Sequence, residues 1–198
     1  MTGAARGPGA RAAHEPVTGL LLVGGASSRF GSPKALARWA PTGQTLAERA
    51  WAVLAGACEE GLAGGKAADA LSLPFPLIDD GSELRVPLVG LVAGLRAARH
   101  DLCLVLPVDC PLVDAATLAA LAAACAGRDA AHPPSGPVPG AWRRSALPAL
   151  QAELASGRLS MWRALDGLDA AVVDVDEQKL ADADDPAALA ALAARGPV

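Results

Sequence analysis

The sequence contains no tyrosine, and aromatic side chains make up only 3% of its 198 residues. It has no stretch of about 18 apolar residues free of glycine, proline and charge, so no membrane-spanning segment is expected. The net charge is −4 and there is no long basic run, which argues against broad binding to nucleic acid. The four cysteines form no CxxC pair and the three histidines are scattered, so neither a zinc site nor a histidine catalyst is indicated.

The first residues, 1–16, are mostly Ala, Gly, Pro and Arg, without the continuous apolar segment that directs export. We expect a disordered leader over residues 1–16 and one domain over residues 17–198, which is long enough for a sizeable core. The irregular cysteine spacing fits a reducing compartment, so the expected location is the cytoplasm.

A glycine-rich segment, Thr18–Leu36, reads TGLLLVGGASSRFGSPKAL. Its apolar start is typical of a buried strand, and its glycines allow a tight turn that exposes backbone N–H groups to a ligand. Two cations, Arg29 and Lys34, come after the turn, so the segment suits a phosphate-bearing ligand. It is neither the GxGxxG dinucleotide motif nor Walker A, because five residues separate Gly25 from Gly31 and Lys34 does not follow directly.

This segment resembles the signature of the nucleotidyltransferases built on a sugar-nucleotide-transferase fold, most of all that of the molybdenum cofactor guanylyltransferases, L-A-G-G-x-S-x-R-[MF]-G-x-[DP]-K-[AG]-L. The residues that match it in place are Leu22, Gly24, Gly25, Ser27, Arg29, Phe30, Gly31, Lys34 and Leu36. The resemblance implies an α/β fold, a three-layer sandwich with a mostly parallel sheet of the nucleotide-diphospho-sugar-transferase type (Rossmann-like, GT-A). The alternation of strand and helix patterns independently predicts this fold class.

A second segment, Asp101–Val113, reads DLCLVLPVDCPLV. Its near-continuous apolar run, Leu102–Leu106, is typical of a central parallel strand, and Asp109 follows that strand. Ligands of open α/β sheets bind beyond the carboxyl ends of the strands, which makes Asp109 a candidate site residue. The segment resembles the family's C-D-x-P or V-D-x-P motif, whose aspartate holds Mg²⁺, and a carboxylate is a suitable ligand for that ion.

The same resemblance carries further residues into the site. Gly64 falls where the family often has a polar residue, and Asp80 where it has an aspartate that contacts base or ribose. Near the end of the chain, Asp182 and Asp184 stand where asparagine or aspartate is common, and Asp184 is a candidate second metal ligand with helix capping as its alternative role. The implied site comprises nucleotide-binding Leu22, Val23, Gly24, Gly25, Lys34, Gly64, Asp80 and Asp109, catalytic Arg29, Lys34 and Asp109, and the Mg²⁺ ligands Asp109 and Asp184.

The implied reaction is the Mg²⁺-dependent transfer of GMP from GTP to molybdopterin that carries molybdenum, with release of pyrophosphate. The implied partners are GTP and a molybdopterin-type acceptor, with transient contacts to proteins that mature molybdoenzymes. Two alternatives stay open: a CTP-dependent cytidylyltransferase, or another nucleotidyltransferase acting on a small phosphate, and a non-catalytic protein that binds nucleotide or hands on the cofactor. Intact Arg29, Lys34 and Asp109 favour an enzyme.

Periodicity and turn residues predict the remaining elements. Strands are expected at Gly61–Gly65, Leu73–Ile78, 138–144 and 170–175, and helices at 45–56, 87–99, 112–125, 146–154, 159–165 and after Asp185. Pro74 and Pro76 indicate that the strand at 73–78 is an edge strand or an irregular segment. Residues 127–140 are expected to form a loop. Thr45 with Glu48 predicts a capping box, and Asp114 and Asp185 are expected helix caps. Four arginines, Arg143, Arg144, Arg158 and Arg163, could meet an anionic acceptor, although arginines are mostly solvated surface charges.

Overall fold

The computed structural model describes residues 15–24 and 30–195. Its strands are β1 (Val17–Leu22), β2 (Glu60–Gly65), β3 (Leu77–Asp79), β4 (Leu102–Pro107), β5 (Ala130–His132), β6 (Gly140–Arg143) and β7 (Ala170–Val172). Its α-helices are α1 (Leu46–Ala55), α2 (Pro87–Ala97), α3 (Ala115–Ala124), α4 (Leu147–Ala155), α5 (Met161–Leu165) and α6 (Pro186–Ala194). The expected leader, apart from its last two residues, and the predicted site residues Gly25 and Arg29 lie outside the described residues.

The strands form one seven-stranded sheet in the order β3-β2-β1-β4-β6-β5-β7. The strand β1 pairs in parallel with both β2 and β4, and β7 pairs in parallel with β5. Among the described strands only β6 runs against the others, because it is antiparallel to both of its neighbours. The prediction of a mostly parallel sheet is confirmed, and six strands end at the same side, which we call the carboxyl edge.

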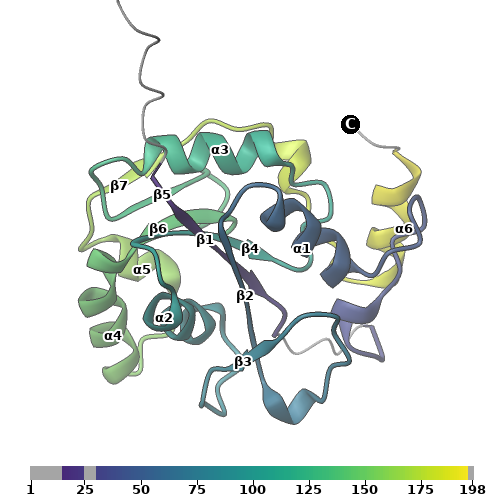
Figure 1. Ribbon diagram of the computed structural model, residues 1–198, viewed down its shortest axis with the longest axis horizontal. Helices are drawn as coiled ribbons and strands as arrows, with labels where there is room; N and C mark the ends of the chain where they lie inside the picture. Colours follow the sequence, from purple (N-terminus) through teal and green to yellow (C-terminus); the bar gives the residue numbers. More distant parts are fainter. Residues whose placement is uncertain (1–14, 25–29, 196–198) are drawn as a thin grey trace, which may run out of the picture.

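Helices cover both faces of the sheet (Figure 1), which confirms the three-layer prediction. Leu21 faces a core that contains residues of α1, α3 and α6, whereas Leu20 faces a second core built with α2, α4 and α5. This alternation follows from the two-residue period of a strand, and both leucines are fully buried. Within the described residues, no helix is long and apolar enough to cross a membrane.

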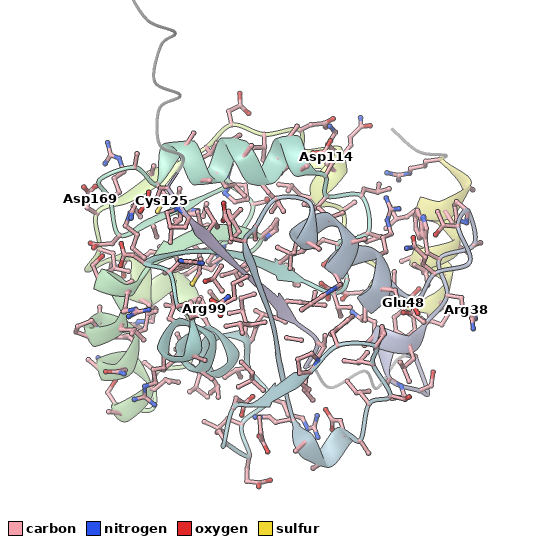
Figure 2. The ribbon with its side chains drawn as sticks, viewed as in Figure 1. Arg38, Glu48, Arg99, Asp114, Cys125 and Asp169 are labelled. Atoms are coloured by element: carbon pink, nitrogen blue, oxygen red, sulfur yellow. The ribbon has the colours of Figure 1, made fainter. Side chains whose placement is uncertain are left out.

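The helix ends follow the chemistry of the predicted caps. Thr45 and Glu48 form the expected capping box at α1, and Pro87 is the first residue of α2. Asp114 accepts a hydrogen bond from the N–H of Thr117, and this cap begins α3 (Figure 2). Asp185 likewise caps α6.

Three strand predictions need correction. The expected loop at 127–140 contains β5, whose sequence Ala-Ala-His has little strand propensity but whose residues are buried between β6 and β7. At 73–78 the structure has only the edge strand β3, which begins after Pro74 and Pro76, because proline cannot donate to the ladder. The last strand, β7, ends at Val172 rather than Val175.

Candidate active site

The site is built where β1, β2 and β4 end side by side. Leu22, the last residue of β1, pairs with Gly64 of β2 and with Pro107 of β4. The ladder continues past the strand ends, because the N–H of Val23 donates to the carbonyl of Gly64 and the N–H of Val108 donates to that of Leu22, each at 3.0 Å. The segments after the three strands are therefore held together at the carboxyl edge, where open α/β sheets bind ligands.

A cavity of about 370 Å³ lies at this edge. It is lined by the segments that follow β1, β2 and β4, by Asp80 and the residues between β3 and α2, by the first turn of α2, and by Lys34 and Asp184. This volume is in the range of small-molecule sites. The lining combines an apolar floor with charged side chains on opposite sides, an arrangement that can orient a ligand with one flat and one charged part.

Lys34 and Asp109, predicted to converge from distant motifs, are in contact. The ammonium Nζ of Lys34 lies 3.0 Å from Oδ2 of Asp109 and 3.5 Å from Oδ1 of Asp184. The Lys34 side chain is 14% exposed, against 29% for Asp109 and 54% for Asp184, so the cluster stays open to a ligand. Two carboxylates thus converge on one ammonium.

Asp184 reaches the cluster through a main-chain contact. The N–H of Ala183 donates to the carbonyl of Asp109 at 2.8 Å, and Ala183 is fully buried. The neighbouring Asp185 supplies the cap of α6. The alternative role considered for Asp184, helix capping, therefore belongs to Asp185, and Asp184 is the residue that turns to Lys34.

The chain before Lys34 is turned by a glycine. Gly31 has φ +65°, in the left-handed region that favours glycine, and a Cβ there would have no neighbour within 4 Å. The 3₁₀ helix η1 (Lys34–Leu36) begins three residues later. The ammonium of Lys34 also lies 5.5 Å from the centre of the Phe30 ring, a cation–π contact that restricts its position.

The opposite side of the cavity holds a second lysine–aspartate pair. Nζ of Lys66 lies 2.5 Å from Oδ1 of Asp80, and the two side chains are only 8% and 6% exposed. Nearby, Arg85 makes a two-pronged ion pair with Asp69, and its hydrogen bonds lower the pKa of that carboxyl. Asp80 was expected from the family resemblance, whereas Lys66 and Arg85 were not.

The thiol next to Asp109 is buried and does not line the cavity. Cys110 is buried, and burial first, then the charge of Asp109, raise the pKa of its thiol well above the ordinary value. A thiol held neutral in this way is unreactive at neutral pH. The charged groups of the cavity are thus its lysines, its aspartates and Arg85.

The structure brings together every predicted site residue that it describes. These residues, all of which line the cavity, are Leu22, Val23, Gly24, Lys34, Gly64, Asp80, Asp109 and Asp184. Lys66 was missed, although its place directly after the predicted strand 61–65 is a signal that could have identified it.

Three of the arginines suggested for an acceptor are engaged elsewhere. Arg143 ends the antiparallel strand β6, so it lies at the side opposite to the carboxyl edge, where it pairs with Glu15 and Asp101. Arg144 donates to the carbonyl of Ala98, and Arg158 pairs with Glu153.

The donor set at Lys34 fits a magnesium ion. Asp109 and Asp184 each bring a carboxylate oxygen to the same ammonium, and Mg²⁺ is usually held by one or two carboxylates together with substrate phosphates and water. No group of three or more His, Cys, Asp or Glu side chains arranged to hold a metal occurs in the described chain. A metal at this place would therefore depend on the ligand for the rest of its coordination.

Comparison with known sequences gives a consistent result. Residues 19–172 match the sequence profile of the MobA-like NTP transferase domain. A probable molybdenum cofactor guanylyltransferase from Chloroflexus aggregans is 37% identical over 153 residues, which are 73% of this chain and 74% of that protein. A molybdenum cofactor guanylyltransferase from Pseudomonas putida is 32% identical over 165 residues, 77% of this chain and 84% of that protein.

Solved structures share the fold. Molybdopterin-guanine dinucleotide biosynthesis protein A from Archaeoglobus fulgidus superimposes with a TM-score of 0.76 at 22% identity, over 90% of this chain and 97% of that one. The 2-C-methyl-D-erythritol 4-phosphate cytidylyltransferase from Thermus thermophilus gives 0.68 at 18% identity, over 90% and 98%. The predicted sugar-nucleotide-transferase fold is confirmed, and the fold alone does not select the nucleotide.

Proposed function

Because this chain belongs to the MobA-like NTP transferase family, we propose that it transfers GMP from GTP to a molybdopterin acceptor and releases pyrophosphate. The chain is a nucleotidyltransferase, and the names of the relatives from Chloroflexus aggregans and Pseudomonas putida support guanylate as the transferred group. The acceptor and the requirement for Mg²⁺ are part of the proposal.

The observation that carries the proposal is the cluster of Lys34, Asp109 and Asp184 at one side of the cavity. A phosphoryl-transfer enzyme does little covalent chemistry itself, and depends on positioning and on neutralising phosphate charge. An ammonium at the carboxyl edge supplies such a charge, and its two aspartate partners keep it in place until a polyphosphate arrives.

The proposed reaction has one bond-forming and one bond-breaking event. An oxygen of the acceptor's phosphate attacks the α-phosphorus of GTP and forms a new P–O bond. The bond from that phosphorus to the bridging oxygen of the β-phosphate breaks, and pyrophosphate leaves with the electron pair. Lys34 stabilises the charge that develops on the phosphate oxygens. Leu22, Val23 and Gly24 line the cavity beside the nucleotide.

Asp109 and Asp184 would hold Mg²⁺. When bound, this ion supplies Lewis-acid stabilisation of the phosphate oxygens. With or without the ion, the two aspartates orient the ammonium of Lys34 and limit how far it can move toward the ligand.

The test is pyrophosphate release by the purified protein in the presence of MgCl₂, molybdopterin carrying molybdenum, and either GTP or CTP. The proposal expects release with GTP that depends on acceptor and Mg²⁺, and little release with CTP. Faster turnover with CTP would reassign the protein to the cytidylyltransferase alternative. Binding of GTP without release under any of these conditions would favour the non-catalytic alternative.

A further inference from the structure

The ion pair of Lys66 and Asp80 has no part in the chemistry described so far. Both side chains are nearly fully buried, yet both line the cavity. Burying two charges costs desolvation free energy that their attraction often only just offsets, so a buried ion pair is weak evidence of a stabilising role. Its position against the ligand space indicates a role in recognition.

Hydrogen-bonding capacity is left over on both partners. Nζ of Lys66 donates to Oδ1 of Asp80 and to the carbonyl of Ser82, which uses two of its three N–H groups. Oδ1 of Asp80 also accepts from the N–H of Ser82. In the described chain, Oδ2 of Asp80 accepts no hydrogen bond. Every fully buried side-chain oxygen or nitrogen there has a hydrogen-bond partner, so Oδ2 is not fully buried and is the accessible oxygen of this carboxylate. One donor and one acceptor are thus available side by side.

The turn after β3 fixes this pair. The N–H of Asp80 donates to the carbonyl of Gly65, which extends the pairing of β2 and β3. Gly81, at φ +68°, turns the chain so that its N–H meets the side chain of Asp79. The carboxylate of Asp80 is therefore oriented by main chain on both sides before any ligand binds.

Small residues line the cavity beside this pair, and at Gly64 and Gly90 no side chain projects into it. At Gly64 an added Cβ would have its nearest neighbour, Cδ1 of Leu20, at 3.5 Å, which is ordinary van der Waals contact. Gly90 in the first turns of α2 also lines the cavity. Together with the apolar Leu22, these glycines give this part of the cavity a lining that suits a nucleobase, and we call it the slot.

The separation from the phosphate end matches a nucleoside. Lys66 follows β2 and Asp109 follows β4, and only β1 lies between these strands. Two strand spacings are about 10 Å, comparable with the distance from a nucleobase to its 5′-phosphate. A nucleotide with its phosphates at Lys34 would place its base at Lys66.

We propose that Lys66 is the specificity-determining residue of this cavity and that it reads guanine. Its remaining N–H donates to O6 of the base, and Oδ2 of Asp80 accepts from N1–H or the 2-amino group beside it. Adenine offers a donor at position 6 and an acceptor at N1, so it meets the same pair in reversed order. Lys66 also positions Asp80, through the hydrogen bond at Oδ1.

The inference rests on the proposed function in taking a nucleoside triphosphate as the occupant, and it is tested by equilibrium binding without acceptor. The probes are GTP, inosine triphosphate, which lacks the 2-amino group, and 2-aminopurine riboside triphosphate, which lacks both O6 and the N1–H. The wild type should bind GTP on the order of tenfold more tightly than the 2-aminopurine nucleotide, because that probe offers no acceptor to the remaining N–H of Lys66 and no N1–H to Asp80. Equal affinity for the two in the wild type would overturn the inference without any variant.

The variant Lys66→Met removes the donor at similar length. Its preference for GTP over the 2-aminopurine nucleotide should fall at least about threefold below that of the wild type, because only the N1–H contact with Asp80 then distinguishes the two probes. Lys179→Met is the matched control: Lys179 pairs with Asp114 at 2.6 Å away from the cavity, so its loss should leave the preference unchanged. A cooperative thermal unfolding transition in each variant shows that the variant is folded.

The outcomes separate this inference from the proposed function. A folded Lys66→Met protein that binds all three probes more weakly but keeps the wild-type preference would show that Lys66 is structural, and would overturn the inference alone. A wild type that transfers GMP but does not discriminate at O6 would do the same. A wild type that binds no nucleotide would overturn both.

Discussion

One cavity holds two lysine–aspartate pairs that differ in burial and in surroundings. The pair of Lys66 and Asp80 is at least 92% buried on both sides and is tied into a turn, whereas Lys34 faces two aspartates, of which Asp184 is half exposed. A buried pair with fixed partners suits recognition of a neutral, directional group such as a base. An open cluster, in which one ammonium meets two carboxylates, suits an exchange of partners with phosphate and metal.

The largest expected effect is on the open cluster. Asp109→Asn keeps the shape of the side chain but removes its charge, and we expect GMP transfer to fall on the order of 10³-fold. The Asp80→Asn protein should retain far more of its maximal rate, because Asp80 lies at the base end. Pyrophosphate release at saturating GTP and acceptor measures both, and equal losses would contradict the division of the cavity into two ends.

Lys34→Ala should lower kcat and raise KM for GTP together, with kcat/KM reduced on the order of 10²-fold, because the ammonium neutralises phosphate charge in the bound and transition states. Lys179→Ala is the control for loss of a lysine that pairs with an aspartate outside the cavity. Steady-state kinetics with varied GTP measure the change. Unchanged kinetic constants in Lys34→Ala would remove this residue from the site.

For the stability of the fold, the buried pair of Lys66 and Asp80 should matter more than the open cluster at Lys34. Lys66→Met leaves the carboxylate of Asp80 buried without its partner, so the free energy of unfolding should drop by about 3 kcal/mol. Lys34→Met should change it by less than about 1 kcal/mol, since its carboxylate partners remain open to water. Urea unfolding of the two variants measures this, and a larger loss in Lys34→Met would contradict the assigned roles.

Two adjacent glycines give a smaller, sterically defined contrast. A Cβ at Gly65 would lie 2.8 Å from Cγ2 of Val23, so Gly65→Ala should lower the free energy of unfolding by about 1–3 kcal/mol. A Cβ at Gly64 has room, so Gly64→Ala should stay within about 1 kcal/mol of the wild type. Thermal unfolding distinguishes the two, and equal destabilisation would show that Gly64 is packed against Leu20 more tightly than the 3.5 Å distance to its Cδ1 indicates.

The third lysine–aspartate pair, Lys179 with Asp114, predicts the smallest effect. Burial alone would raise the pKa of Asp114, but hydrogen bonds from Lys179 and Thr117 lower this pKa to about 2, from 3.8 for an ordinary aspartate. A lowered carboxyl pKa stabilises the fold above the unfolded value and loses that contribution as the pH falls from about 4 to 2. The melting temperature of Asp114→Asn should therefore depend less on pH in this window than that of the wild type.

The residues that could be predicted from the sequence are those whose roles are local. Lys34 and Asp109 lie in segments where strand, turn and charged residue follow one another, and the parallel sheet brings their strand ends together. The pairing of Lys66 with Asp80 depends on the register of β2 with β3, which no local pattern contains. The cap at Asp185 was predicted, whereas the approach of Asp184 to Lys34 depends on a main-chain hydrogen bond from Ala183 to Asp109, which no local pattern contains.

The prediction missed the strand β5 because it, too, depends on contacts with distant parts of the chain. Its three residues carry no strand pattern of their own, and they are extended because β6 and β7 pair with them on both sides. Tertiary context overrides weak propensity most easily in such short segments.

The most direct test of the two-ended cavity is a crystal structure with Mg²⁺ and a GTP analogue whose α–β bridge cannot be cleaved. We predict the triphosphate at Lys34 and Asp109, and the base in the slot beside Lys66 and Asp80. A base at Lys34 with the phosphates at Lys66, or a nucleotide bound outside the cavity, would contradict the account.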